Sequence, residues 1–295
     1  MKNFFSSINS FFIYLVIKFF FFLEDNIKKI RKVKFDKFSK NKQYQFYSHN
    51  KFHFVLFAKD QYISRSTYIN GPYDFFLLRK SINCLPKSFV RHTLIDVGAN
   101  IGTVCVPAML KKIFKECIAI EPNDNIFRIL KSNILINNCE NKIRCFNYCI
   151  SSKNNENLSF TINMKNFGDT RFIKNSSVND KLKFPKNRVK KLDYFFNLVD
   201  PKKTLIKIDV QGFESNVIMG SKSFLNCGSP LLLEFDPSSF LLKDFEKIFD
   251  LLKNNYQYYF DLDEKISKKN NILELKNLFF ILRQTKKYKN ILIRT

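Results

Sequence analysis

The sequence has no tryptophan, and only seven of its 295 residues are glycine. Ordinary proteins contain about 7% glycine, so a chain this poor in glycine is expected to keep it where the backbone needs it. Seven cysteines is an odd count, and no two of them form a CxxC pair. The closest group, Cys139, Cys145 and Cys149, matches no zinc spacing, so we expect reduced thiols and no metal site.

Acidic residues are scarce relative to basic ones: 26 Asp and Glu stand against 50 Lys and Arg, a formal net charge of +24. Such a charge suits an anionic partner, such as nucleic acid, an acidic glycan or a membrane surface. However, Lys, Asn, Ile, Phe and Tyr are abundant together, as in proteins from AT-rich genomes. No arginine-rich block or basic stripe interleaved with aromatics stands out. We therefore favour compositional bias over a nucleic-acid surface.

The longest hydrophobic run is at the N-terminus. Residues 4–23 (FFSSINSFFIYLVIKFFFFL) approach the length that spans a bilayer, and the basic run KKIRKVK follows at 28–34. Lys18 and the early polar residues weaken a span, and no small-residue cleavage site marks a signal peptide. We expect an amphipathic or buried helix that rests on a membrane, giving a cytoplasmic protein peripheral contact through residues 4–34. A single span is the alternative.

The chain divides into three parts. Residues 1–45 hold the hydrophobic and basic segments, and residues 46–90 alternate in short aromatic pieces (YQFYS, FHFVLFA, YISRSTYI) that predict a small β-rich lead-in. In residues 91–295, helical segments alternate with the predicted strands TLIDV, ECIAIE, KIRCFNYCI, TLIKIDV and PLLLEF. We expect the domain to end in a pair of strands, YQYYF and LKNLFFILR. This order predicts a Rossmann-like α/β domain, with a mostly parallel sheet and helices on both faces. Ligands bind such sheets beyond the carboxyl ends of the strands.

The stretch DVGANIG follows the first strand of this domain. Gly98 and Gly102 predict a tight turn that lets a ligand approach the backbone. A dinucleotide fold prefers GxGxxG, but Asn100 stands at its second glycine, and the lysine of a P-loop is missing. Glu121 ends the next strand, where a carboxylate can accept both hydroxyls of a ribose. An adenosine-bearing ligand without phosphates fits best, and S-adenosylmethionine is the common one, with Asp96 near its ammonium group.

The stretch TLIKIDVQGFE at 204–214 repeats this design. Methyl transfer needs an aligned acceptor and, for a hydroxyl, removal of a proton. Asp209, at the end of the strand, is placed for that work. Glu214 either assists it or stabilises the helix that it opens. We expect Glu234, at the end of PLLLEF, to line the same cleft, and Lys207 either to reach a carboxylate or to extend to solvent.

Together these motifs resemble the FkbM family of S-adenosylmethionine-dependent methyltransferases. The resemblance rests on DVGANIG at 96–102, EP at 121–122, LD at 192–193, IKIDVQGFE at 206–214 and the PLLLEF strand. It runs from about Tyr73 to about Gly220, and more weakly to Phe235. The resemblance implies the seven-stranded class I methyltransferase fold and O-methylation, often of sugar hydroxyls. The cofactor-binding residues that it carries over are Asp96, Gly98, Asn100, Gly102 and Glu121.

Two positions depart from the family pattern. Gln211 replaces a glutamate, and Tyr73-Asp74 replaces an aromatic residue followed by glutamate. Glutamine cannot act as a base, although it donates and accepts hydrogen bonds. Activity is therefore retained if the family's glutamate only orients a ligand, and it is in doubt if that glutamate takes a proton or binds a metal.

The leading hypothesis is an O-methyltransferase acting on a sugar hydroxyl of a glycan or glycoconjugate. A nucleic-acid methyltransferase is an alternative suggested by the charge, but the only stretch resembling an Asn/Asp-Pro-Pro-aromatic loop, NGPYD at 70–74, lacks the double proline. A degenerate, non-catalytic, membrane-associated member is the third possibility. We expect the lead-in and the loop at 151–185, which includes GDTR at 168–171, to shape the acceptor cleft. No feature indicates an oligomeric state.

Overall fold

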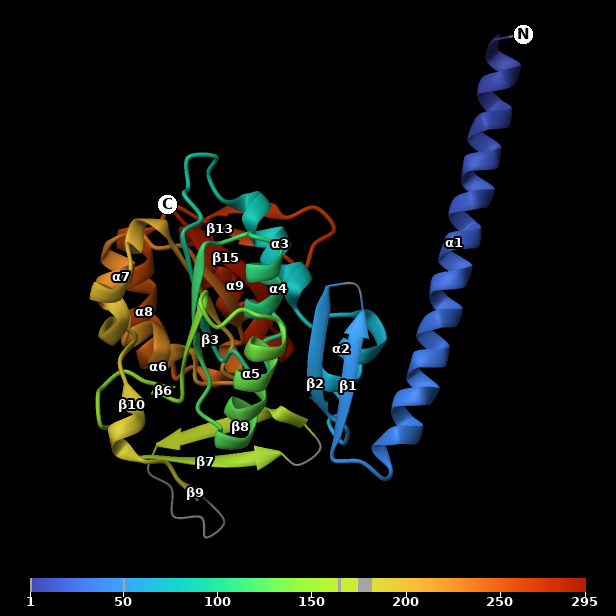
Figure 1. Cartoon of the computed structure of the whole chain (residues 1–295). Coiled ribbons are helices and arrows are strands. Elements are labelled where there is room, and N and C mark those ends of the chain that lie inside the picture. The colour runs from blue at the N-terminus through green and yellow to red at the C-terminus, as the bar shows by residue number, and fades with distance from the viewer. Residues whose placement is uncertain (1, 50, 164–165, 175–181) are drawn as a thin grey trace.

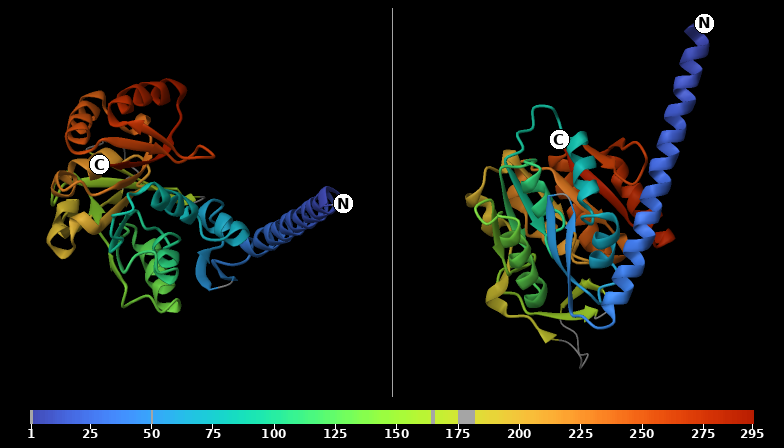
Figure 2. Two further views of the ribbon diagram at one scale, coloured as in Figure 1. Left: turned by 90° about the horizontal axis from the view of Figure 1, so that it is seen from above. Right: turned by 45° about the vertical axis from the view of Figure 1, so that its right-hand side comes forward.

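The computed structural model consists of a rounded α/β body from which one long helix projects (Figures 1 and 2). It describes the backbone of residues 2–49, 51–163, 166–174 and 182–295, and the side chains of residues 13–49, 51–161, 184–238 and 240–295.

An eight-stranded sheet, counted over the described residues, forms the centre of the body, in the order β14-β13-β15-β12-β11-β3-β4-β5. Five adjacent strands are parallel: β12 (Leu231–Phe235), β11 (Thr204–Ile208), β3 (Thr93–Val97), β4 (Glu116–Ile120) and β5 (Ile143–Phe146). The antiparallel additions are β15 (Lys289–Arg294), β13 (Tyr258–Asp261) and β14 (Lys268–Asn271). The mostly parallel sheet is confirmed. It has one strand more than the expected seven, because the short β14 extends its edge.

Helices cover both faces of the sheet (Figure 1). One face carries α3 (Phe75–Cys84), α4 (Cys105–Leu110) and α5 (Asp124–Ile136), and the other carries α6 (Glu214–Met219), α7 (Lys222–Asn226), α8 (Leu242–Asn255) and α9 (Leu275–Thr285). Leu94 of β3 packs into the first core and Ile95 into the second, so every position of this strand is buried, as in a parallel strand covered on both sides. The seven cysteines, all described, form no disulfide in this structure.

Smaller elements surround the sheet. The strands β6 (Cys149–Ile150) and β10 (Val189–Lys190) form a parallel pair, and β7 (Leu158–Asn163), β8 (Asn166–Lys174) and β9 (Leu182–Lys183) form a three-stranded sheet. Short 3-10 helices lie at Lys186–Arg188, Leu192–Leu198, Pro201–Lys203, Pro237–Ser239 and Ile272–Glu274. The region 151–185 thus contains more strand than was predicted. The side chains of GDTR at 168–171 lie outside the described residues.

The lead-in is β-rich only in its first half. The strands β1 (Tyr44–His49) and β2 (Phe52–Phe57) form a hairpin, but the stretch YISRSTYI lies in α2 (Ile63–Asn70), so the prediction of strand there is wrong. The reason is local: the Asp60 carboxylate accepts the backbone N–H groups of Tyr62 and Ser64 at 3.1 and 2.8 Å, which satisfies donors at the start of a helix.

The predicted terminal strand pair is also partly wrong. YQYYF supplies β13, but LKNLFFILR forms α9. Its buried residues Leu275, Phe279 and Leu282 have the spacing of one helix face. The partner of β13 is instead β15, which inserts between β12 and β13. An apolar run this dense fits both the 3.6-residue period of a helix and the two-residue period of a strand. Its spacing alone therefore does not separate helix from strand.

Helix α1 (Lys2–Ser39) points away from the body (Figures 1 and 2). Its apolar side chains between residues 13 and 23 are exposed, so the expectation of a buried helix is wrong for this part. Within the part of the chain that the structure describes, no helix has the length and apolar character needed to cross a membrane. The side chains of residues 4–12 of the predicted segment 4–23 lie outside that part.

Candidate active site

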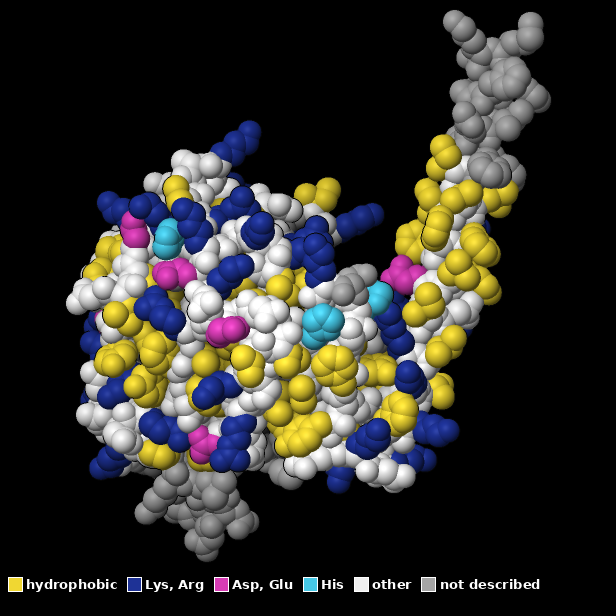
Figure 3. Space-filling model, viewed as in Figure 1, with side chains coloured by type: hydrophobic (Ala, Val, Ile, Leu, Met, Phe, Trp, Pro, Cys, Tyr) yellow, Lys and Arg dark blue, Asp and Glu magenta, His cyan; other side chains and the backbone are white. Residues whose placement is uncertain are grey.

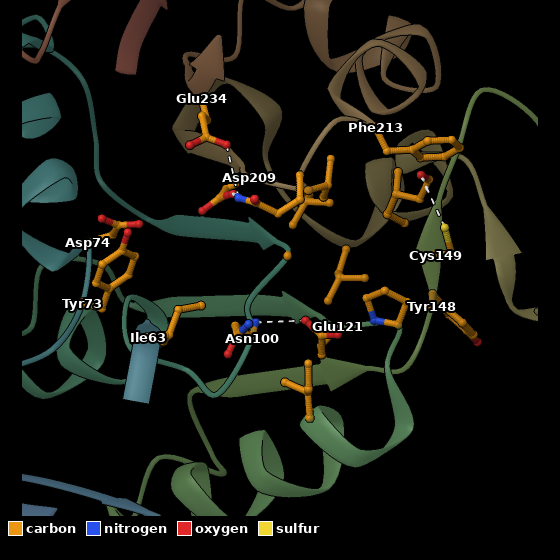
Figure 4. A pocket seen from close by; sticks show the side chains of 18 of the residues that line it. Ile63, Tyr73, Asp74, Asn100, Glu121, Tyr148, Cys149, Asp209, Phe213 and Glu234 are labelled. Atoms are coloured by element: carbon orange, nitrogen blue, oxygen red, sulfur yellow. Dashed lines mark hydrogen bonds between the residues drawn. The ribbon is translucent and has the colours of Figure 1, made fainter. Parts of the chain in front are cut away.

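Two turns meet at the carboxyl edge of the sheet (Figure 4). The first, residues 96–102, ends β3, and the second, residues 209–214, ends β11. These strands are parallel neighbours at the point where the strand order reverses, which is where open α/β sheets bind ligands. The backbone N–H of Asp209 donates to the carbonyl of Val97 at 3.2 Å. Both turns therefore line one cavity.

Gly98 allows the two turns to touch. Its φ is +80°, and a Cβ there would lie 1.9 Å from the backbone oxygen of Asp209. Any other residue would therefore push the turns apart. Gly102, with φ of +90°, has a different neighbour, because a Cβ there would meet Leu130 Cδ1 of α5 at 3.0 Å. Gly98 thus lines the cavity, and Gly102 packs the turn onto the helix behind it.

The cavity has two chemically different ends (Figure 4). One end is largely apolar and carries Tyr148, Cys149 and Phe213. The other carries carboxyl, amide and phenol groups: Tyr73, Asp74, Asp209, Gln211, Glu234 and Tyr288. Asn100 and Glu121 lie between them. A ligand that fills the cavity would therefore place an apolar group at one end and a polar, hydrogen-bonding group at the other.

Glu121 supports the first turn from the neighbouring strand. Its carboxylate accepts the backbone N–H of Asn100 at 3.1 Å and that of Asn123 at 2.9 Å. The side chain is buried and lines the cavity. Burial raises the pKa of Glu121 to about 7, although these two hydrogen bonds oppose the shift. Each carboxylate oxygen has a second lone pair, so Glu121 can accept further hydrogen bonds from a ligand.

Asp96 lies beneath the first turn and is fully buried. Lys207 Nζ lies 3.2 Å from its Oδ1 and 3.7 Å from Oδ2 of Asp209, so of the two possibilities for Lys207, contact with a carboxylate is confirmed. Burial alone would lower the pKa of Lys207, but the two carboxylates raise it. Asp96 is not among the residues that line the cavity, and it already has a cationic partner. This geometry favours a supporting role for Asp96, and its direct contact with a ligand ammonium group stays a prediction.

Gln211 joins two carboxyl groups at the polar end. Its Nε2 donates to Asp209 Oδ1 at 2.9 Å and to Glu234 Oε2 at 3.2 Å (Figure 4). Burial and the charge of Asp209 raise the pKa of Glu234. The expectation that Glu234 lines the cleft is confirmed. A glutamate at position 211 would place a third acid between the other two, whereas the amide donates to both.

Glu214 opens α6 and is fully buried. Its carboxylate accepts the backbone N–H of Val210 at 3.0 Å and that of Gly212 at 3.0 and 3.2 Å. It is not among the residues lining the cavity. The geometry therefore favours the second interpretation of Glu214, a carboxylate that stabilises the turn and the helix start, over contact with the acceptor.

Asp74 and Tyr288 are the main cavity residues that sequence reasoning did not assign to the site. Asp74 has the left-handed φ of 57°, and burial, followed by the charge of Asp209, raises its pKa to about 7. The Tyr73-Asp74 pair stands where the family pattern has an aromatic residue followed by glutamate, and this position is a signal that could have identified Asp74. Tyr288 precedes β15 and carried no such signal, because only the folded sheet brings it to this edge.

The chain was also compared with known proteins. The sequence model of the methyltransferase FkbM domain matches residues 96–259. One similar solved structure is a methyltransferase FkbM from Methylobacillus flagellatus, with 14% identity, coverage of 80% of this chain and 55% of that chain, and a TM-score of 0.42. A second is TYW2 of M. jannaschii in complex with AdoMet, with 10% identity, coverage of 86% of each chain and a TM-score of 0.41. A third is StiE O-MT residues 961–1257, with 12% identity, coverage of 76% of this chain and 73% of that chain, and a TM-score of 0.41. The chain thus spans about half the length of the Methylobacillus protein. No curated protein sequence matches it.

Proposed function

Because the chain belongs to the FkbM family of methyltransferases, whose sequence model matches residues 96–259, we propose that it is an O-methyltransferase acting on a sugar hydroxyl of a glycan or glycoconjugate. S-adenosylmethionine is its methyl donor. The observation that carries the proposal is the pair of facing turns, which gives one cavity a largely apolar end and an end rich in carboxyl groups.

The cofactor is assigned to the first turn and the apolar end. Gly98 and Asn100 bring the backbone close to it, and Glu121 accepts hydrogen bonds from the ribose hydroxyls. The apolar end suits the adenine ring. Asp96 and Gly102 act from behind the turn: Asp96 fixes Lys207, and Gly102 permits close packing on α5. They are positioning residues that keep the turn in its binding shape.

The acceptor is assigned to the polar end. S-adenosylmethionine, when bound, would supply its sulfonium methyl group to an acceptor hydroxyl and leave as a thioether. The part left to the chain is to align that hydroxyl and accept its proton. Asp209 is the base in this proposal, because its side chain is 25% exposed and its carboxylate accepts a hydrogen bond from the Gln211 amide. Glu214 keeps the second turn in shape.

The chemistry of the polar end supports a sugar over a nucleic acid. Asp74, Asp209 and Glu234 all lie there, and carboxyl groups exchange hydrogen bonds readily with vicinal hydroxyls. The same groups oppose a phosphate, and the nearby Lys207 is already engaged by Asp96 and Asp209. The net positive charge of the chain is therefore not found at this end of the cavity.

The test is transfer of a labelled methyl group from S-adenosylmethionine to pools of glycans, glycolipids and RNA by the purified chain. We expect label in the carbohydrate pools, in a linkage stable to base as a methyl ether is, and none with Asp209→Asn. Labelling of RNA alone would overturn the acceptor class. A wild-type protein that binds the cofactor but labels no pool would favour a non-catalytic role.

A further inference from the structure

The outer part of helix α1 is apolar on nearly all sides. Ten of the eleven residues from 13 to 23 are exposed hydrophobic residues, and those in 19–22 are 58–64% exposed. Four consecutive residues span more than one helical turn of 3.6 residues, so these phenylalanines point in every direction around the axis. Figure 3 shows hydrophobic side chains along both edges of this segment. Lys18 is the exception, and its Nζ lies 4.9 Å from the ring centre of Tyr14.

Basic residues follow this segment along the same helix. Residues 28–37 contain six Lys or Arg and one Asp, which is 6 − 1 = +5. The one acid, Asp36, pairs with Arg65 of α2 through two contacts of 2.9 Å. Lys29, Lys32 and Lys34 are exposed. The helix thus has an apolar outer segment and a basic inner segment.

The inner end of α1 is fixed to the body. Phe35 is fully buried and its ring lies 5.5 Å from that of Tyr68, and Arg31 donates to the carbonyl of Ile69 at 3.2 Å. Both partners belong to α2, whose first residue, Ile63, lines the cavity. The helix therefore holds a set direction relative to the active-site body.

We propose that α1 is a membrane-insertion arm, with residues 13–23 entering the hydrocarbon of an anionic bilayer and residues 28–37 meeting its head groups. A helix that is apolar all round needs apolar surroundings on every side, which hydrocarbon provides. A second copy of α1 packed alongside would cover only one side. Residues 13–23 measure about 16 Å along the helix, roughly half of a hydrocarbon core about 30 Å thick, and residues 2–12 continue the same helix outward. The basic segment is complementary in charge to anionic lipids.

Vesicle flotation of the 295-residue chain tests the proposal. The protein is mixed with vesicles of phosphatidylcholine, with or without phosphatidylglycerol, as detergent is removed. We expect flotation with the anionic vesicles, and its loss in Phe20→Asp/Phe22→Asp. Because each basic residue near an anionic surface contributes about 1 kcal/mol, or about fivefold in affinity, Lys29→Gln/Lys32→Gln is expected to weaken binding by more than tenfold at low salt.

Matched controls change equal groups elsewhere on the body. Ile266→Asp/Leu273→Asp alters two exposed apolar residues, and Lys243→Gln/Lys247→Gln removes two exposed lysines of α8; both should float like wild type. Circular dichroism and thermal melting verify folding of every variant. The proposal is overturned if wild type stays unbound, if the arm variants float equally well, or if sedimentation shows that the arm forms oligomers in place of binding vesicles.

Discussion

The turns after β3 and β11 share one local design but present different groups to the cavity. Each follows an aspartate at the end of a buried parallel strand, and each contains left-handed residues. Each is stabilised by a glutamate that accepts backbone N–H groups, Glu121 for the first turn and Glu214 for the second. In the first turn the aspartate, Asp96, is buried while the glutamate faces the cavity. In the second the order is reversed: Asp209 faces the cavity and the glutamate is buried.

This exchange of positions between aspartate and glutamate shows that the role of a carboxylate depends on which side of the turn it occupies. A motif such as Asp-x-Gly predicts the bend equally well in both places. The residue exposed to the cavity is the one that can contact a ligand, and the buried one holds the backbone in shape. Exchange of equivalent residues in the two turns should therefore give unlike results.

The largest difference is expected between Asp96→Asn and Asp209→Asn. The first leaves Lys207 buried without its nearest partner, which should cost about 3–5 kcal/mol of unfolding free energy. The second should leave stability almost unchanged and lower turnover by about 10²–10⁴-fold, the usual contribution of a general base. Urea unfolding and labelled methyl transfer measure the two effects. If Asp209→Asn retains turnover, Asp209 is not the base.

Gly98→Ala comes next, with Gly71→Ala as its control. Both glycines have positive φ, so each alanine should lose about 1–2 kcal/mol of stability from backbone strain. Only at Gly98 would the new Cβ also meet backbone, 1.9 Å from the Asp209 oxygen. At Gly71 the nearest atom is the Tyr47 hydroxyl at 3.7 Å. We expect Gly98→Ala to destabilise the fold further and abolish cofactor binding in calorimetry. Equal effects at both positions would contradict the close approach of the turns.

The two supporting glutamates can be compared directly. Glu121→Gln should weaken S-adenosylmethionine binding by about tenfold or more, because a charged acceptor of the ribose is lost. Glu214→Gln removes a buried acceptor that does not line the cavity. It should lower stability by about 1–2 kcal/mol and leave the cofactor dissociation constant within about twofold. Titration calorimetry beside thermal melting separates these outcomes. A stronger binding defect in Glu214→Gln would reverse the assignment.

Gln211→Glu restores the residue usual in the family and tests whether the amide is adapted to this cavity. A glutamate would place a third carboxylate beside Asp209 and Glu234, and it could donate only when protonated. We expect turnover to fall by about tenfold at neutral pH, since two hydrogen bonds are lost, and to recover partly as the pH is lowered. A gain in turnover at neutral pH would show instead that Gln211 impairs catalysis.

A further comparison of the two glutamates concerns the pH dependence of stability. Burial raises the pKa of both Glu121 and Glu214 from 4.5 to about 7. The folded protein therefore holds these protons more tightly than the unfolded chain. Their contribution to stability is present in full below about pH 4.5 and is lost as the pH rises through about 7. We expect the unfolding free energy to fall between about pH 5 and pH 8, and the fall to be shallower in Glu214→Gln. An unchanged slope in this variant would contradict the raised pKa of Glu214.

Prediction from sequence succeeded where a local pattern determines a local conformation. The strands β3, β4, β11 and β12 were predicted almost to their ends. A short apolar run that is followed by polar residues or glycine has few alternative conformations. The pattern was insufficient at YISRSTYI and LKNLFFILR, which fit both helix and strand. There the deciding factors were the side chain of Asp60 in one case and burial of one helix face in the other.

By itself the sequence determined the two turns, the carboxylates within them and the family, since these depend on glycine, polar residues and spacing along the chain. Tertiary structure decided which of these groups share a cavity. It buried Asp96 and Glu214, turned Asp209 toward the cavity, and brought Asp74 and Tyr288 to the same sheet edge from distant segments. The physical reason is that strand order and packing set these distances, and a local pattern carries no record of which strands become neighbours.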